Sequence, residues 1–507
     1  MSKRIPVLVG VGQHVVRDTD PKSGLSPLSL AVDACQAALA DCRGDGGAIK
    51  IVSHIDTIGV VRLNSDSVPG RSGPFGVYGN LPRLIAERLG ADPAHAILSA
   101  VGGQSPQQLV NEMCNRIAAG KSDVALLTGS EAIATMKAAL RSGTALGWDD
   151  SIEGQLEDRG QGPSLVEPYE LAGGMGFPPQ VYGAFEHAWR GKRGLSIDEH
   201  AAHMAKLFAP FSTVAANNPY AQFPVERDEA FLQTPSKDNY AIADPYLKWH
   251  VAQDAVNQGA ALLLTHEEQA SALGIPQEQW VYLHGGADVQ DKLVTLRPEL
   301  HASAAMGAAM RGALKHSNTE ISDMQHLELY SCFPCAVQFA CDSIGIDTAG
   351  RTLTQTGGLP FFGGAGNNYS MHGIASMVET LRADPGSLGL VLANGGFLSK
   401  ESVGVYSTKR PAAFALINSA QAQASIDDVA DVAIADAPDR GTIEAYSVLH
   451  KGREPLFAYA FMRAGNERFL ARTKTGDIQA VERFMASDPL GAEFSVNAGE
   501  KRNDLLA

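Results

Sequence analysis

One structural unit occurs twice in this chain, and it limits the fold more than any other feature of the sequence. The first copy is HAILSAVGGQSPQQLVNEMCNRI at residues 95–117, and the second is HLELYSCFPCAVQFACDSIG at residues 326–345. Each copy predicts an apolar strand, a tight turn and a helix with one apolar face. The two copies share few identical residues, so the duplication rests on the pattern. Such a chain is expected to fold as two similar α/β halves.

Strands and helices alternate through the N-terminal part of the chain. The stretches IPVLVGVG (5–12) and IDTIGVVRL (55–63) predict buried strands, and SPLSLAVDACQAALADC (26–42) predicts the helix between them. Apolar strands that alternate with helices are typical of sheets covered on both faces. The order therefore predicts α/β halves, with a mostly parallel sheet in the first half.

Two segments depart from this alternation. Residues 142–245 are rich in Pro, Gly, Asn and charge, and are too long for a plain loop, so they predict an inserted loop domain. After Pro411 the short alternating strands, such as GTIEAYSVLHK and PLFAYAFMRAG, predict a small β-rich domain like an OB barrel. We therefore expect an N-terminal half at 1–285, which contains the loop domain, a second half at 286–411, and an additional domain at 412–507.

Composition excludes several classes of function. The net charge of −15 argues against general binding to nucleic acid or to an anionic membrane. The sequence has no run of about 18 apolar residues that could span a membrane. The N-terminal MSKRIPVLVGVG lacks a cleavage-site pattern, and six cysteines in 507 residues do not indicate a disulfide framework. A cytoplasmic location is therefore expected.

The turn in the first copy, AVGGQSPQQLV at residues 100–110, is the first candidate site. Ser105 is a natural N-cap and Pro106 suits the first helical turn. The free N–H groups of a helix start can bind an anion or support a nucleophile. Here the turn offers only Gly102 and Gly103, which have no functional side chain. The glycines either permit close backbone packing or mark an active-site turn without its nucleophile.

Several further stretches give residues 1–410 a resemblance to the thiolase superfamily, which implies a duplicated thiolase fold of two mixed βαβ halves with a loop-domain insertion. The β-rich tail adds a resemblance to thiolase-like type 1 proteins, which carry an additional C-terminal domain. The thiolase loop domain is resembled by AGGMGFPPQVYGAFEHAW (172–189), and the end of the first thiolase half by AVNQGAALLLTHEEQASALG (255–274). Three later stretches stand at the places of thiolase motifs: LELYSCFPCAVQ (327–338) at Asn-Glu-Ala-Phe, TGGLPFFGGAGNNYSMHG (356–373) at Gly-His-Pro, and LANGGF (392–397) at Cys-x-Gly.

The resemblance also shows which thiolase groups are missing. Gly103 stands where thiolases carry the acylated cysteine, Gly364 where they carry the Gly-His-Pro histidine, and Ala393 where they carry the second catalytic cysteine. Thiolase chemistry needs a thiolate to hold the acyl group and a base to deprotonate the second substrate. Neither conventional group remains here. Backbone N–H groups at the turns of Gly103 and Gly363–Gly366 retain a capacity for oxyanion binding.

Some thiolase-superfamily members are aldolases that cleave a β-hydroxyacyl-CoA without a cysteine. They carry a tyrosine at the Asn/His position and a Tyr-x-His-Gly stretch nearby, which YSCF and YSMHG resemble, the second with one extra residue. This resemblance implies Tyr330, Tyr369 and His372 as catalytic candidates. Each has a structural alternative, as a core tyrosine or a helix-start histidine. Those aldolases use a separate OB-fold partner, and the tail resembles such a partner fused to the chain.

The resemblance implies CoA or an acyl-CoA as the ligand, with no permanently bound cofactor. Met175 and Gly176 are candidates for the pantetheine pocket, and Asn367 and Asn368 could donate to a ligand carbonyl. Structural alternatives are packing of the loop domain for the first pair and a simple turn for the second. No metal is expected, because the helical His-x-x-His at residues 200–203 lacks a third ligand.

Three functions stay open from the sequence. The first is an enzyme that makes or breaks a C–C bond next to a CoA thioester without a nucleophilic cysteine. The second is a thiol-dependent acetyl-CoA acyltransferase, for which Cys332 is the nearest thiol. The third is a non-catalytic protein that binds a CoA ligand. The sequence leaves the acyl chain, the reaction direction and homo-oligomer formation open.

Overall fold

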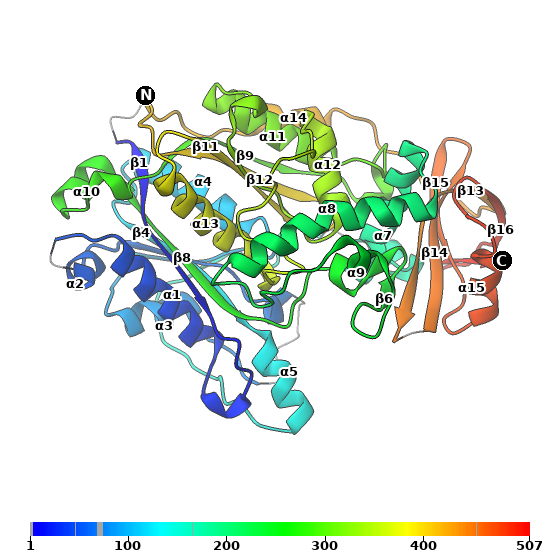
Figure 1. Ribbon diagram of the computed structural model, residues 1–507, viewed down its shortest axis with the longest axis horizontal. Coiled ribbons are helices and arrows are strands. Elements are labelled where there is room, and N and C mark those ends of the chain that lie inside the picture. The colour runs from blue at the N-terminus through cyan, green and yellow to red at the C-terminus, as the bar shows by residue number, and fades with distance from the viewer. Residues whose placement is uncertain (1–3, 46, 68–74, 165, 453, 507) are drawn as a thin grey trace.

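Two β-sheets form the centre of the protein, with a layer of helices between them (Figure 1). The computed structural model describes residues 4–506 apart from 46, 68–74, 165 and 453. The first sheet has six strands, of which β1–β8 and β8–β4 pair antiparallel and the others parallel. The sheet is therefore mixed, as the resemblance implied, and not mostly parallel as the strand–helix alternation alone predicted, because β8 returns antiparallel after the long excursion. In spatial order the strands are β1 (Pro6–Val15), β8 (Asn257–His266), β4 (Ala125–Ala132), β2 (Thr57–Val60), β3 (His95–Leu98) and β5 (Glu157–Asp158).

The second sheet repeats the arrangement of the first with fewer strands. Its β9–β12 and β12–β11 pairs are antiparallel and its β11–β10 pair is parallel, as for β1–β8–β4–β2. The two halves of the core are therefore similar in topology. In spatial order the strands are β10 (His326–Glu328), β11 (Leu388–Gly395), β12 (Lys400–Ser407) and β9 (Tyr282–Gln290).

Three helical layers enclose the two sheets. Alternate residues of the strands explain the layers: in β4, Leu126 faces one helical layer and Leu127 faces the other. In the fold, α4 of the first half lies beside α13 of the second half, whereas the repeated sequence unit matches α4 with α12. The outer layer on the first sheet contains α1 (Pro27–Asp41) and α3 (Leu81–Leu89), the middle layer α4 (Ser105–Ala118) and α13 (Tyr369–Ala383), and the outer layer on the second sheet α11 (Ala304–Ser317) and α12 (Pro334–Ile344).

The excursion at 142–245 is mostly helical, and the C-terminal segment forms a barrel. The barrel strands follow the order β14–β15–β17–β16–β13, and a β13–β14 pairing closes the ring. The remaining longer elements are α2 (Gly47–Val52), α5 (Ile133–Ser142), α6 (Pro168–Gly173), α7 (Pro178–Arg193), α8 (Ile197–Asn217), α9 (Glu229–Gln233), β6 (Ala241–Ala243), β7 (Tyr246–Leu247), α10 (Glu267–Ala272), α14 (Ala420–Asp427), β13 (Arg440–Lys451), β14 (Glu454–Ala464), β15 (Glu467–Arg472), α15 (Ile478–Phe484), β16 (Glu493–Asn497) and β17 (Asn503–Leu506).

The barrel packs against the rest of the chain beside α7 (Figure 1). Arg468 of the barrel is fully buried, pairs with Glu444 and donates to the carbonyl of Thr295 at 2.9 Å. Arg190 of α7 holds Asp488 with two hydrogen bonds of 2.7 Å. The apolar join after Pro411 predicts docking rather than a flexible tether, and these contacts agree with it. Within the described residues, no helix is long and apolar enough to cross a membrane.

Candidate functional site

The first glycine turn joins β3 to α4 and lies inside the protein. Gly102 has a φ of 144°, which favours glycine over any residue with a side chain. Ser105 is the first residue of α4 rather than its N-cap, and its hydroxyl donates to the carbonyl of Ala100 at 2.9 Å. The N-cap residue Gln104 makes no capping hydrogen bond with its side chain. The start of α4 therefore keeps N–H groups without a side-chain cap.

The tyrosine of the second half fills the space beside Gly103. A Cβ atom built on Gly103 would lie 2.4 Å from the Tyr330 hydroxyl oxygen and 2.5 Å from the carbonyl oxygen of Asn394. Real Cβ atoms do not approach other heavy atoms so closely, so any side chain at position 103 requires movement of its neighbours. The structure thus brings Gly103 and Tyr330 together and leaves no room for a nucleophilic side chain on this turn.

Tyr330 is a neutral phenol in this environment. Only 6% of the residue is exposed, and burial raises the pKa of its hydroxyl well above 10. The nearby Cys332 and Glu401 raise the pKa further. Within the described residues the hydroxyl has no hydrogen-bond partner. It is therefore free to donate one hydrogen bond to a group that enters the turn.

Strand β11 contributes Asn394, a residue that the sequence interpretation missed. Its Nδ2 donates to the Tyr182 hydroxyl at 3.0 Å and contacts the Cys332 sulfur at 3.7 Å, while its Oδ1 is buried without a partner in the described chain. Ala393, the predicted counterpart of the second thiolase cysteine, is fully buried on the same strand and offers no polar group. The polar neighbour of the turn is thus Asn394.

Strand β12 contributes a second residue that the sequence interpretation missed. Glu401 is 1% exposed, and neither carboxyl oxygen has a hydrogen-bond partner among the described residues. Glu401 is paired across the strands with Asn394, so their side chains project from the same face of the second sheet. The sequence gives little signal, because Glu401 follows the charged Lys400 at the start of a strand that also contains Ser402 and Ser407.

Tyr369 is part of a closed hydrogen-bond network rather than of the turn. Its hydroxyl donates to Glu328 at 2.7 Å and lies 2.6 Å from the Thr356 hydroxyl. Glu328 also accepts hydrogen bonds from the backbone N–H groups of Gln355 and Thr356. The Tyr369 ring contacts the Tyr330 ring edge-on, with centroids 5.5 Å apart. Tyr369 therefore supports Tyr330, and its own hydroxyl is already occupied.

His372 lies farther along the same row of rings. Its ring contacts Phe362, which in turn contacts Tyr369. Its Nδ1 lies 2.9 Å from Gln13 Oε1, and its Nε2 is buried without a partner in the described part of the chain. Burial lowers the pKa of His372 to about 3, so the imidazole is neutral. No ring or hydrogen-bond contact between described residues joins His372 to Tyr330 or Gly103.

Two backbone N–H groups of the second glycine turn, those of Gly364 and Gly366, are used in internal hydrogen bonds. The N–H of Gly364 donates to the Gln253 carbonyl at 2.8 Å, which leaves it unavailable as the expected oxyanion donor. The side-chain amides of Asn367 and Asn368 donate to the carbonyls of Arg62 and Gly129, at 2.9 and 2.7 Å. These two asparagines therefore connect the halves of the core instead of presenting donors to a ligand.

The Gly-Gly-Met-Gly stretch of the loop domain lies against the barrel. Met175 is fully buried in the largest apolar cluster, and Gly176 is exposed. A Cβ atom on Gly173 would lie 2.8 Å from Leu470, and one on Gly174 would lie 3.3 Å from Tyr459. The first two glycines thus permit close approach of the barrel.

Other motifs have structural partners. Cys332 and Cys335 are buried, and burial raises the Cys332 pKa to about 12, which keeps its thiol protonated. His200 lies 2.9 Å from the buried Glu186 and stacks on His203. The described residues contain no cluster of three or more His, Cys, Asp or Glu placed to hold a metal ion.

Comparisons with known proteins extend this description. No family model matches the sequence. The chain is 41% identical to a monomeric SCP2-thiolase like protein type 1 from Mycobacterium smegmatis, and the match covers 99% of both chains with a TM-score of 0.84. An Ltp2-ChsH2(DUF35) aldolase shares the fold at 19% identity, over 80% of this chain and 97% of that one, with a TM-score of 0.57.

A curated relative covers less of the protein. The sequence is 22% identical over 257 residues to an acetyl-CoA acetyltransferase of Methanocaldococcus jannaschii, a match that spans 50% of this chain and 58% of the relative. The chain thus spans less than two thirds of that relative's length. Together the comparisons agree with a thiolase fold of mixed sheets that carries a C-terminal five-stranded β-barrel.

Proposed function

The chain belongs to the SCP2-thiolase-like protein type 1 family of the thiolase superfamily, and from this premise we propose that it handles an acyl-CoA at the turn around Gly103 and Tyr330. The names of its relatives support this ligand class, since one is an acetyl-CoA acetyltransferase. The proposed ligand is CoA or an acyl-CoA, and no resident cofactor is proposed.

One observation decides which reaction the turn supports best. The Tyr330 hydroxyl occupies the space that a side chain at position 103 would need. A covalent acyl-enzyme cannot form on a residue without a nucleophile, so the thiolase route through an acyl-cysteine is unavailable at this position. A neutral phenol can instead donate a hydrogen bond or a proton to an oxygen of the substrate.

The reaction class that fits these groups makes or breaks a C–C bond next to a CoA thioester. Such a reaction passes through an enolate of the thioester, whose negative oxygen is stabilised by hydrogen-bond donors. In the proposed site, Tyr330 is a donor and the uncapped start of α4 adds positive dipole. Tyr369 is proposed to hold the Tyr330 ring in place by direct contact. His372 is proposed to support Tyr369 through Phe362. The likeness to an aldolase of the same fold supports this reading.

The barrel has a proposed role in this site. We propose that it is an OB-like domain at about residues 412–507, fused to a core whose halves are divided near residue 285. Its contacts with the Gly-Gly-Met-Gly stretch and with α7 would shape the entrance for the ligand. The exposed Gly176 lies at this junction, so a ligand that follows the junction would pass Gly176.

Turnover measurements test the proposal. Purified protein is incubated with a panel of β-hydroxyacyl-CoAs and β-ketoacyl-CoAs, and C–C cleavage is followed as release of acetyl-CoA. We expect activity in the wild type, loss of about a hundredfold or more in Tyr330→Phe, and little change in the control Tyr282→Phe. The control removes a hydroxyl that bonds to Glu267 on the far edge of the sheet.

The alternatives give different outcomes in the same assays. A thiol-dependent acyltransferase that uses Cys332 loses activity in step with alkylation by iodoacetamide. That alternative has weak chemical support, because the Cys332 thiol is buried and protonated. A non-catalytic CoA-binding protein shows binding of CoA by calorimetry and no turnover on any member of the panel.

A further inference from the structure

Lys400 is a buried cation beside the first glycine turn. It begins β12, and only 7% of the residue is exposed. Its ammonium donates a hydrogen bond to the Val101 carbonyl oxygen at 3.0 Å, and no carboxylate among the described residues forms an ion pair with it. Burial lowers the pKa of the ammonium below its usual value of 10.5. A buried charge without a counter-ion destabilises a fold, so such a residue is commonly retained for a function.

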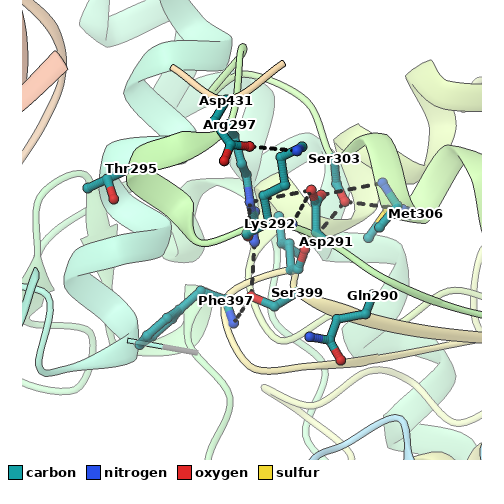
Figure 2. A network of polar contacts seen from close by, with 12 residues as sticks. Gln290, Asp291, Lys292, Thr295, Arg297, Ser303, Met306, Phe397, Ser399 and Asp431 are labelled. Carbon is teal, nitrogen blue, oxygen red and sulfur yellow. Dashed lines mark hydrogen bonds and ion pairs between the residues drawn. The ribbon is translucent and has the colours of Figure 1, made fainter. Parts of the chain in front are cut away.

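The hairpin that carries Lys400 is fixed by a second cation, which has a counter-ion. Figure 2 shows Arg297, whose Nη2 donates to Ser399 Oγ at 2.9 Å. The same hydroxyl oxygen accepts a hydrogen bond from the Phe397 N–H at 3.3 Å (Figure 2). The charge of Arg297 is balanced by Asp291, which lies 3.8 Å from its Nε (Figure 2). The cation that holds the hairpin is thus neutralised, whereas Lys400, the next residue after Ser399, has no carboxylate partner in the described chain.

Strand pairing places the Lys400 side chain on the face of the second sheet that lies against the start of α4. Lys400 is opposite Gly395 of the antiparallel strand β11, and residues opposite each other project from the same face. A Cβ atom built on Gly395 would lie 3.1 Å from the backbone nitrogen of Gly103, and would also contact Gln104 Oε1. The face that carries Lys400 is therefore the face that lies against the glycine turn.

The start of α4 adds a second electropositive group at this place. Its N–H groups have no side-chain cap, so the positive end of the helix dipole is open. Gln104, the residue before α4, is 4% exposed, and its Oε1 has no hydrogen-bond partner among the described residues. The turn thus combines a cation, a helix start and a buried polar side chain that the described part of the fold leaves unsatisfied.

The ammonium can be reached from the surface of the protein. Gly162 is exposed, and a Cβ atom built on it would lie 3.4 Å from Lys400 Nζ. Ala100 and Val101, at the beginning of the turn, are partly exposed. A ligand group that enters between Gly162 and the turn therefore contacts Lys400 without crossing the core.

We propose that Lys400 is a ligand-binding residue whose ammonium pairs with a carboxylate at the end of the acyl group of a bound CoA thioester. This inference rests on the proposed function, and it names the substrate class as an acyl-CoA with a carboxylated acyl chain. The acyl group is the source of the anion because Val101 is two residues from Gly103, whereas the length of the pantetheine arm separates the phosphates of CoA from the thioester.

A carboxylate has the chemistry that this environment lacks. An ammonium has three N–H donors, of which Val101 occupies one, so two donors are available to a carboxylate. The negative charge of the ligand would balance the buried positive charge and would be favoured by the helix start. A neutral acyl chain of the same length would place a methyl group against the ammonium and leave its charge unpaired. Lys400 therefore favours a carboxylated acyl group over a neutral one.

Binding of matched acyl-CoAs tests this selectivity by calorimetry. The probes are two pairs of equal chain length, succinyl-CoA with butyryl-CoA and glutaryl-CoA with pentanoyl-CoA, which differ by a terminal carboxylate in place of a methyl group. In at least one pair, the wild type should bind the carboxylated member about tenfold or more tightly, the worth of a hydrogen bond between charged groups. Lys400→Met, which keeps the length and removes the charge, should lose this preference and bind the neutral member with unchanged affinity.

Lys292→Met is the matched control, because the Lys292 ammonium pairs with Asp431 at 2.6 Å (Figure 2). This variant should keep the wild-type preference. Melting temperatures show whether each variant is folded, and the comparison of probes on the wild type decides the matter even if Lys400→Met does not fold.

Three results would overturn the inference and leave the proposed function intact. They are equal binding of both members of each pair to the wild type, a preference that persists in folded Lys400→Met, and an equal loss of affinity for both members in that variant. The last result would assign the ammonium to the phosphates of CoA. Absence of binding of every CoA thioester to the wild type would overturn both the inference and the proposed function.

Discussion

Two buried tyrosine–glutamate pairs stand beside each other in the second half of the core, and they differ in how the fold treats their carboxyl groups. Glu328 receives hydrogen bonds from Tyr369, from the hydroxyls of Thr354 and Thr356 and from two backbone N–H groups. Glu401 receives none within the described chain, although it acts electrostatically on Tyr330. The same residue types are structural where the fold satisfies them and available for chemistry where it does not.

The largest effect on stability is expected for Tyr369 and Glu328, the satisfied pair, whose carboxyl group is fully hydrogen-bonded. Glu328→Leu removes the acceptor of several buried donors, among them Tyr369 and Thr356, and leaves them unpaired. The free energy of unfolding should fall by about 3 to 5 kcal/mol, as for other buried networks that lose one partner. Thermal unfolding followed by fluorescence measures the loss. The corresponding Glu401→Leu is the control, and an equal loss in both variants would contradict the contrast between the pairs.

The next largest effect on stability is expected beside Tyr330 and Glu401, the open pair, whose carboxyl group has no hydrogen-bond partner among the described residues. Gly103→Cys restores the residue type of the thiolase position, but its Cβ would lie 2.4 Å from the Tyr330 hydroxyl and 2.5 Å from the Asn394 carbonyl. Overpacking of this kind costs about 1 to 3 kcal/mol. Unfolding experiments should show this loss and no gain of thiolase activity.

A double-mutant cycle shows whether Tyr330 causes that loss. In the background of Tyr330→Ala, which removes the ring and the hydroxyl, Gly103→Cys should cost less than it does in the wild type. Equal costs in both backgrounds would assign the strain to the Asn394 backbone alone, and would remove Tyr330 from the explanation of the glycine.

The open pair should also give a distinct pH dependence. Because the pKa of Glu401 is raised from its usual value of 4.5, the folded state holds a proton that the unfolded state releases above that pH. Stability is therefore lost as the pH rises from about 4.5 toward the folded pKa, since the folded state then binds more protons. Glu401→Gln removes this loss. The difference in melting temperature between Glu401→Gln and the wild type should be small near pH 4 and increase toward neutral pH.

Neighbouring groups do not produce the same trend in that difference. The pKa values of Tyr330 and Cys332 are raised by burial, so both groups stay neutral over this range. Asp291 and Arg297, which act electrostatically on Glu401, are unchanged between the two proteins. A difference that stays constant from pH 4 to 8, or that decreases with pH, would show that Glu401 has a partner in solution.

The sequence predicts the architecture of this protein better than the chemistry of its site. The α/β halves, the inserted segment and the C-terminal β-rich domain could be predicted, because each depends on local patterns. These patterns are the apolar strands, the helix caps and the repeated unit. The direction of β8 could not be read in this way, since nothing local in residues 257–266 states that the strand returns antiparallel beside β1. The pairing of α4 with α13 likewise depends on contacts between the two halves.

The site illustrates the same limit. Gly103 and Tyr330 could be found by resemblance to a family, and the structure brings them together. Glu401 and Asn394 could not, because their importance lies in a cross-strand pairing and in the absence of partners for their buried oxygens. Tyr369 and His372 have the residue types of a catalytic pair, yet their hydrogen bonds to Glu328 and Gln13 are visible only in three dimensions.

The smallest effect separates the two tyrosines by removal of a single oxygen atom. Tyr369→Phe deletes a donor to Glu328 and a hydrogen-bond partner of the Thr356 hydroxyl, so the free energy of unfolding should fall by about 1 kcal/mol. Tyr330→Phe deletes a hydroxyl without a partner among the described residues, so its stability should change by less than about 0.5 kcal/mol. The order reverses for function, because only Tyr330 has a free donor beside Gly103. Thermal melts of both variants compare their losses of stability, and acetyl-CoA titrations compare their losses of affinity. If Tyr330→Phe destabilised the protein as much as Tyr369→Phe, the Tyr330 hydroxyl would have a structural partner, and the distinction between a satisfied and an open pair would fail.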